Sequence, residues 1–210
     1  MKKYYLIFAL LAFLLVGFLT NDAKASITIA TFSDPSNDSS NSLFTADFAA
    51  LQLTGGWGDS KTGLTLQIPY TGHSYSNAWF DVSTILLTGQ IVPGMPYYNT
   101  GGGTVHFYKD GTTINPLLTI SFTGGFLSPY GFSANETMFT ATDVTITGSE
   151  ITNVLSQEQF SFSFANTASL LTHPGFTATA SFTSSAVPEP ATIGLLCAGG
   201  LTILRKKKRS

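Results

Sequence analysis

The side chains best suited to chemistry are three histidines, one cysteine and a few acids, and their spacing predicts no catalytic or metal site. His73, His106 and His173 lie far apart, and none belongs to an H-x-H or H-E-x-x-H pattern, so no zinc site is predicted. No G-x-S-x-G motif occurs, and Cys197 lies inside an apolar run, which leaves no predicted nucleophile. We therefore expect this protein not to be an enzyme.

Acidic and amide oxygens offer a weaker possibility of ligand binding. Asp81 and Asp143 each precede a valine, so we expect them on the outer faces of strands as ordinary exposed carboxylates. Asp34, Asn37 and Asp38 form a loop rich in the oxygen ligands that calcium favours, without the glycine and terminal glutamate of an EF-hand. A solvated turn is the favoured interpretation of this loop, calcium is the alternative, and no cofactor is expected.

Aromatic residues gather between positions 57 and 108 and suggest a second kind of site. Aromatic rings on the loops of a β domain can stack on sugar rings, although most such residues fill cores or cover sheet edges. The candidate carbohydrate-stacking residues are Trp57, Tyr75, Trp79, Tyr97 and Tyr98.

The scaffold for these candidates is predicted to consist of antiparallel strands, because the apolar residues recur with period two. Alternation of this kind, with serine, threonine or glutamine on the other face, is typical of strands that bury one face. It occurs in the segments 27–29, 64–70, 118–122, 160–164 and 176–182. Turn-forming clusters between such segments predict about ten short strands.

The predicted fold is all-β: a single antiparallel β-sandwich over residues 26–182, jelly-roll-like, with an immunoglobulin-like topology as the alternative. Residues 183–186 are expected to be a short polar linker. The single cysteine excludes an internal disulfide, so the hydrophobic core must stabilise the domain by itself.

The N-terminus has the three parts of a secretory signal peptide over residues 1–25. A basic start, Met1-Lys2-Lys3, precedes an apolar helical run, and Ala23-Lys24-Ala25 supplies the small residues that signal peptidase requires. Export through the Sec translocon and cleavage after Ala25 are expected.

The C-terminus has a different three-part pattern over residues 187–210. The tripeptide Pro188-Glu189-Pro190 is followed by an apolar run, residues 191–204, that is predicted to form a transmembrane helix. Fourteen residues span about 21 Å, less than the roughly 30 Å hydrocarbon core, so this run is a marginal anchor. A basic cluster would hold its end in the cytoplasm: Arg205, Lys206, Lys207, Lys208 and Arg209.

This tail resembles the PEP-CTERM sorting signal of bacterial envelope proteins in the order and spacing of its three parts. The resemblance implies that Pro188, Glu189 and Pro190 are the recognition site of a membrane-embedded protease, an exosortase. It also implies a transient inner-membrane anchor, followed by release to the cell surface or beyond, and an association with exopolysaccharide and biofilm.

The charge of the central segment excludes one class of partner. Between Ser26 and Ala186 there are two lysines and ten acidic residues, a net charge of about −8, so phosphates would be repelled and no nucleic acid is expected. The expected function is structural or adhesive, in an extracellular polysaccharide matrix. The alternatives are a carbohydrate-binding module and, less favoured, a glycan-active enzyme.

Overall fold

The computed structural model describes residues 26–33, 41–58, 62–109, 113–135 and 143–188, and these segments form an all-β domain. Eleven strands follow one another along the chain, and no helix occurs among the described residues. They are β1 (Ile27–Phe32), β2 (Phe44–Asp47), β3 (Gln52–Trp57), β4 (Leu64–Ile68), β5 (His73–Gln90), β6 (Tyr98–Tyr108), β7 (Leu118–Ser128), β8 (Gly131–Asn135), β9 (Val144–Thr147), β10 (Leu155–Ser169) and β11 (Gly175–Pro188).

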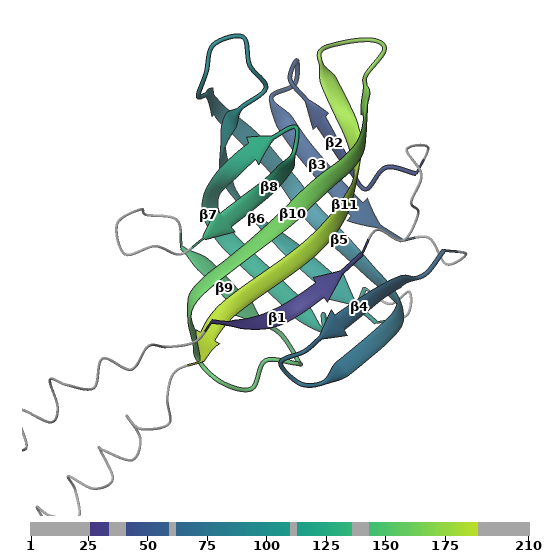
Figure 1. The fold of residues 1–210 in the computed structure, drawn as a ribbon, viewed down its shortest axis with the longest axis vertical. Coiled ribbons are helices and arrows are strands. Elements are labelled where there is room, and N and C mark those ends of the chain that lie inside the picture. The colour runs from purple at the N-terminus through teal and green to yellow at the C-terminus, as the bar shows by residue number, and fades with distance from the viewer. Residues whose placement is uncertain (1–25, 34–40, 59–61, 110–112, 136–142, 189–210) are drawn as a thin grey trace, which may run out of the picture.

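All strands belong to one large antiparallel sheet, which curves round and closes on itself. The strand order is β1-β4-β5-β3-β2-β11-β10-β8-β7-β6, with β9 attached to β7, and the closing contacts are β5–β6 and β1–β11. In Figure 1, β8, β10 and β11 cross in front of β5 and β6. Ile27 pairs with Ala186, so the two ends of the described chain leave the domain side by side.

Phenylalanines from opposite parts of the sheet fill its interior. Phe162 of β10 lies 4.8 Å from Phe44 of β2 and 4.9 Å from Phe182 of β11, measured between ring centroids. Tilted and edge-on ring pairs at such distances add to the stabilisation from burial alone. The expected burial of the 118–122, 160–164 and 176–182 segments is confirmed, with Phe164 only partly buried.

Residues 183–186, expected to be a linker, lie instead inside β11. They pair with β1 on one side and β10 on the other, and Ala186 is fully buried. Ser184 is 1% exposed, and its hydroxyl is satisfied there because it accepts a hydrogen bond from the Ala30 N–H and donates one to the Ala30 carbonyl. Small side chains at 184 and 186 therefore continue the buried face beyond Phe182, and the strand runs on to Pro188.

The predicted helices at the two ends, residues 1–25 and 191–204, lie outside the described residues. Within the described part of the chain, no helix has the length and apolar character needed to cross a membrane.

Candidate functional site

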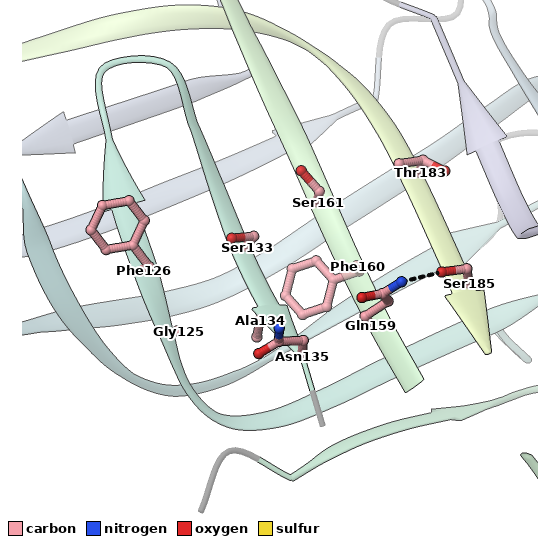
Figure 2. Close-up of a pocket in the computed structure, with 10 residues that line it drawn as sticks. All are labelled: Gly125, Phe126, Ser133, Ala134, Asn135, Gln159, Phe160, Ser161, Thr183 and Ser185. Atoms are coloured by element: carbon pink, nitrogen blue, oxygen red, sulfur yellow. Dashed lines mark hydrogen bonds between the residues drawn. The ribbon is translucent and has the colours of Figure 1, made fainter. Parts of the chain in front are cut away.

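A shallow groove of about 590 Å³ lies on the outer face of the sheet, over β7, β8, β10 and β11 (Figure 2). Its floor includes the buried Ala134 and Phe160, and its other lining side chains point outward from the strands. The outward-pointing residues are Phe126, Ser133, Asn135, Gln159, Ser161, Thr183 and Ser185.

Strand register arranges these side chains in two parallel rows. In the first row, Phe126 pairs with Ser133, Ser133 with Ser161, and Ser161 with Thr183. In the second row, Asn135 pairs with Gln159, and Gln159 with Ser185. Neighbouring strands lie about 4.8 Å apart and every second residue about 6.7 Å apart, so the rows form a regular lattice of hydroxyl and amide groups.

An aromatic pair borders the first row on the β7 side. Phe126 is 39% exposed, whereas most of the described phenylalanines are buried in the core. Tyr97 is half-buried beside it, with ring centroids 6.1 Å apart and an interplanar angle of 20°. The stacked pair therefore presents an apolar surface next to a row of hydroxyl groups.

Among the described residues, the side chains that line the groove are hydroxyls, amides and apolar groups, which are suited to binding by hydrogen bonds and apolar contact. Gln159 Nε2 donates to Ser185 Oγ at 2.7 Å, which fixes the amide and leaves its Oε1 as an acceptor. Hydroxyls and amides both donate and accept hydrogen bonds, so the surface suits a ligand that carries many hydroxyl groups. General acid–base catalysis would need a titratable group, and none of the ten lining residues has one.

The five predicted stacking aromatics do not form one platform. Trp57 is 8% exposed and its indole nitrogen donates to the Thr62 carbonyl at 3.0 Å, while Tyr98 is 9% exposed and stacks on Phe48. Trp79 on β5 pairs with Tyr108 on β6, far from Tyr97 at the opposite end of that strand. Of the five, Tyr97 alone stacks on a residue that lines the groove.

The groove residues themselves were missed as a site, although the sequence carried their signal. The alternating serines and threonines of segments 160–164 and 176–182 predict only the polar faces of two strands. Sequence alone did not reveal that Phe126 and Asn135 of other strands stand in the same rows, because strand order decides this.

Each histidine lies beside a carboxylate. His106 Nδ1 is 2.8 Å from Asp81 Oδ1, on strands where the two residues pair in register. Burial, together with the nearby Asp81 charge and hydrogen bond, raises the pKa of Tyr108 on the same face. His173 Nδ1 is 3.3 Å from Asp47 Oδ1, at the opposite end of the sheet from His73.

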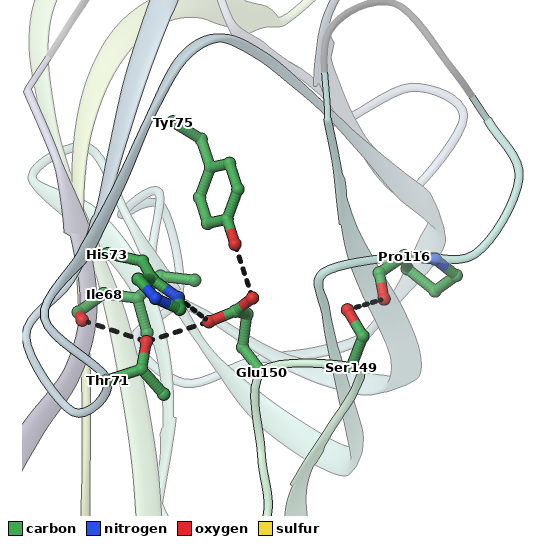
Figure 3. A network of polar contacts seen from close by, with 7 residues as sticks. All are labelled: Ile68, Thr71, His73, Tyr75, Pro116, Ser149 and Glu150. Carbon is green, nitrogen blue, oxygen red and sulfur yellow. Dashed lines mark hydrogen bonds and ion pairs between the residues drawn. The ribbon is translucent and has the colours of Figure 1, made fainter.

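The third histidine belongs to a polar cluster around Glu150, which follows β9 (Figure 3). Thr71 Oγ1 donates to Glu150 Oε2 at 2.8 Å, His73 Nδ1 lies 2.7 Å from the same oxygen, and the Tyr75 hydroxyl donates to Oε1. The hydrogen bond to Glu150, with burial and the carboxylate charge, raises the pKa of Tyr75 to about 12. Burial alone would raise the pKa of Glu150, but the hydrogen bonds from Tyr75, His73 and Thr71 outweigh it, so that pKa lies below its usual value.

The cluster links three connections of the sheet, the first of which is the β9–β10 connection that contains Glu150 itself. Glu150 reaches the β4–β5 turn through its side chain and the β6–β7 connection through its backbone, whose N–H donates to the Leu117 carbonyl at 3.2 Å. Gly148 has a φ of 137°, and a Cβ there would collide with the Leu117 carbonyl oxygen, so the close approach requires glycine. All three donors to Glu150 come from the protein itself, which favours a structural role for the cluster.

A second hollow lies beside β9. Glu158 of β10 lines this hollow and is 6% exposed. Its Oε1 accepts a hydrogen bond from the Ile146 N–H of β9 at 3.1 Å. This carboxylate therefore links two strands that do not pair directly.

Several predicted site residues lie outside the described part of the chain. They are the calcium candidates Asp34, Asn37 and Asp38, the cleavage-site residues Ala23 and Ala25, the motif residues Glu189 and Pro190, and the basic cluster 205–209. Pro188 is the last residue of β11, opposite Leu155. Among the described residues, no group of three or more potential ligands could hold a metal ion.

Comparison of the chain with models of known protein families, with curated proteins and with solved structures found no match.

Proposed function

We propose that this protein is an exported, non-catalytic component of an extracellular polysaccharide matrix and that it binds an uncharged polysaccharide in the groove over β7, β8, β10 and β11. The observation that carries the proposal is the pairing of an exposed aromatic stack, Tyr97–Phe126, with two rows of hydroxyl and amide side chains. Sugars present apolar ring faces and hydroxyl edges, and this surface offers a partner for each.

The charge of the groove supports a neutral ligand. The surrounding domain is acidic, with two lysines and ten acidic residues between Ser26 and Ala186. An acidic polysaccharide would be repelled by this field, and the described residues that line the groove include no lysine or arginine to offset the repulsion.

The fold proposed to support this function is a jelly-roll-like sandwich, because two groups of strands face each other across the phenylalanine core. Such a fold exposes broad outer sheet faces, and one of them carries the groove. The closing pairs β5–β6 and β1–β11 leave most strands with a partner on both sides, which protects an exported protein from edge-to-edge aggregation.

Sorting by an exosortase remains the proposed route to the matrix, and its support is the sequence of the tail. The motif would begin where β11 ends, since Pro188 is both the last strand residue and the first motif residue. After cleavage near the motif, the domain would keep its complete sheet and lose only residues that follow it.

Affinity electrophoresis of the purified chain tests the binding proposal. The gels would contain hydroxyethyl cellulose, dextran, the matrix polysaccharide of the producing bacterium, or acidic alginate. We expect retardation by one or more of the three polymers other than alginate, and its loss in Phe126→Ala and Ser161→Glu. Leu86→Ala and Ser76→Glu are the matched controls, because both residues are exposed on the outer face of β5. Retardation that persists in both groove variants, or that occurs only with alginate, would contradict the proposal.

Intact-protein mass tests the sorting proposal. The mature surface form should begin at Ser26 and lack the apolar run 191–204, and Glu189→Ala should leave an unprocessed form in the inner membrane. Detection of residues 203–205 in the surface form would rule out the proposed processing without bearing on the groove.

A further inference from the structure

Several loops meet at the end of the sheet opposite the two described chain ends (Figure 1), and they carry many exposed apolar side chains. Three connections form it: residues 48–51 between β2 and β3, 91–97 between β5 and β6, and 170–174 between β10 and β11. We call them together the apolar loop end. Its large exposed apolar residues are Leu51 (49%), Ile91 (45%), Val92 (44%), Met95 (52%) and Leu171 (100%), with Leu86 (62%) on the adjoining part of β5. Loops of soluble surfaces are usually polar, so this composition calls for a partner.

The three loops are joined into one surface by specific contacts. The Phe48 N–H donates to the Pro174 carbonyl at 3.0 Å, and the Leu87 N–H donates to the Leu51 carbonyl at 2.8 Å. The Phe48 ring stacks on Tyr98 at 4.9 Å, which links the β2–β3 turn to the start of β6. The apolar tips are therefore held at fixed positions relative to one another.

Several backbone polar groups of the longest loop form hydrogen bonds inside the loop. Ile91 N–H donates to the Tyr97 carbonyl at 2.8 Å, Met95 N–H to the Val92 carbonyl at 3.0 Å, and Gln90 Nε2 to the Met95 carbonyl at 2.6 Å. Pro93, Pro96 and Pro174 remove three further N–H donors from the end. Each of these bonds and prolines lowers the cost of moving the loop out of water, because an unpaired backbone group in an apolar phase costs several kcal/mol.

The apolar loop end also has almost no charge. Its three connections and their flanking residues contain Asp47 and His173 as ionisable groups besides tyrosines, and these two lie within ion-pair distance of each other at 3.3 Å. No lysine or arginine occurs there that could attract an anionic surface.

We propose that the apolar loop end docks on an uncharged lipid surface, with Leu51, Val92, Met95 and Leu171 entering the boundary between headgroups and acyl chains. The tips project from three separate loops, and the two hollows described above lie elsewhere, on the outer sheet face and beside β9. A fluid lipid boundary accommodates separate projecting side chains, whereas a rigid protein surface would need matching pockets. Tyr97, at the base of the β5–β6 loop, suits the level of the headgroups.

This lipid contact uses residues that the polysaccharide groove does not need, Tyr97 excepted. The described chain ends leave from the opposite end of the sheet, so the domain would stand on the lipid with those ends pointing away from it. The domain would then join a lipid surface to a polysaccharide.

A fluorescent label at one position of the full chain tests the contact locally. In a Cys197→Ser background, Leu10→Asp and Leu195→Asp keep the two apolar terminal runs out of the bilayer. An environment-sensitive fluorophore is then attached at Leu171→Cys, or at Ile114→Cys as control, because Ile114 is 75% exposed in the β6–β7 connection of the other end. Phosphatidylcholine vesicles are added with and without a lipid-soluble quencher.

We expect a blue shift and quenching of the label at 171, no change at 114, and little effect of added salt. Adding Val92→Asp and Met95→Asp to the labelled Leu171→Cys chain should abolish the shift, whereas Val154→Asp, at a 67% exposed residue of the other end, should not. An unchanged spectrum at 171 in the presence of vesicles would overturn the proposal. So would a shift that appears without lipid and grows with protein concentration, since it would identify a second copy of the chain as the partner.

Discussion

At the end of the sheet where Ile27 meets Ala186, the connections are held by the partly buried carboxylate of Glu150, which accepts hydrogen bonds from three side chains of the β4–β5 hairpin. At the opposite end, the connections are held by backbone hydrogen bonds and ring stacking, and their tips are apolar side chains that contact little of the domain. The first end uses its polar groups for internal bonds, so it contributes to stability. The second end contributes little through its tips, and this leaves them free to bind a partner.

Both ends rest on the same phenylalanine core, so a core change should exceed any change at either end. Phe162→Ala removes a fully buried ring that contacts Phe44 and Phe182, and we expect it to lower the free energy of unfolding by about 3–5 kcal/mol. Urea unfolding followed by circular dichroism measures the loss. Phe126→Ala, which removes an exposed ring, is the comparison. If Phe162→Ala lowered the free energy of unfolding by less than Phe126→Ala, the packing described above would be contradicted.

Glu150→Gln should produce the next largest effect and lower the free energy of unfolding by about 1–3 kcal/mol at neutral pH. One carboxylate oxygen that now accepts hydrogen bonds would be replaced by an amide nitrogen, which is itself a donor. The folded-state pKa of Glu150 lies below its usual value near 4.5. Its contribution is therefore present above that usual value and is lost as the pH falls through the folded-state pKa. Urea unfolding of parent and variant at a series of pH values measures this, and the two stability profiles should converge in acid.

Tyr75→Phe should lower the free energy of unfolding by about 1 kcal/mol at neutral pH, because it removes one hydrogen bond to Glu150. The pKa of Tyr75 is raised from 10.0 to about 12. The hydroxyl thus stabilises the fold fully below pH 10, and this contribution disappears as the pH rises through 12. Subtracting the variant's stability from the parent's between pH 9 and 12 isolates the effect, and a difference that grows with pH would refute it.

Leu171→Ser and Met95→Ser should have the smallest effect. Each should change the free energy of unfolding by no more than about 0.5 kcal/mol, because neither exposed side chain is part of the core. The same urea titration measures it. A large loss from either change would mean that the apolar tips stabilise the domain itself, and the contrast between the two ends would then fail.

Local alternation in the sequence predicted much of the strand content. Segments such as Phe160–Phe164 and Leu118–Phe122 alternate strictly, and the structure places them in β10 and β7 with the expected face buried. The sequence does not predict the long strand β5, because Thr71–Asn77 is rich in residues that form turns. Asn77 adopts a φ of 58° at a bulge in β5, and pairing with β4 holds the surrounding residues in the strand.

The sequence by itself determined the all-β class and the buried face of the main strands, because these depend on composition and on neighbours along the chain. Tertiary structure alone decided which strands lie side by side, and therefore the two rows of the groove, the convergence on Glu150 and the apolar loop end. Phe126 and Thr183, or Thr71 and Glu150, are far apart in sequence. The members of each pair share a site because strand order and register bring them together. A period-two pattern predicts which face of a strand is buried, but it does not predict which strands lie beside it.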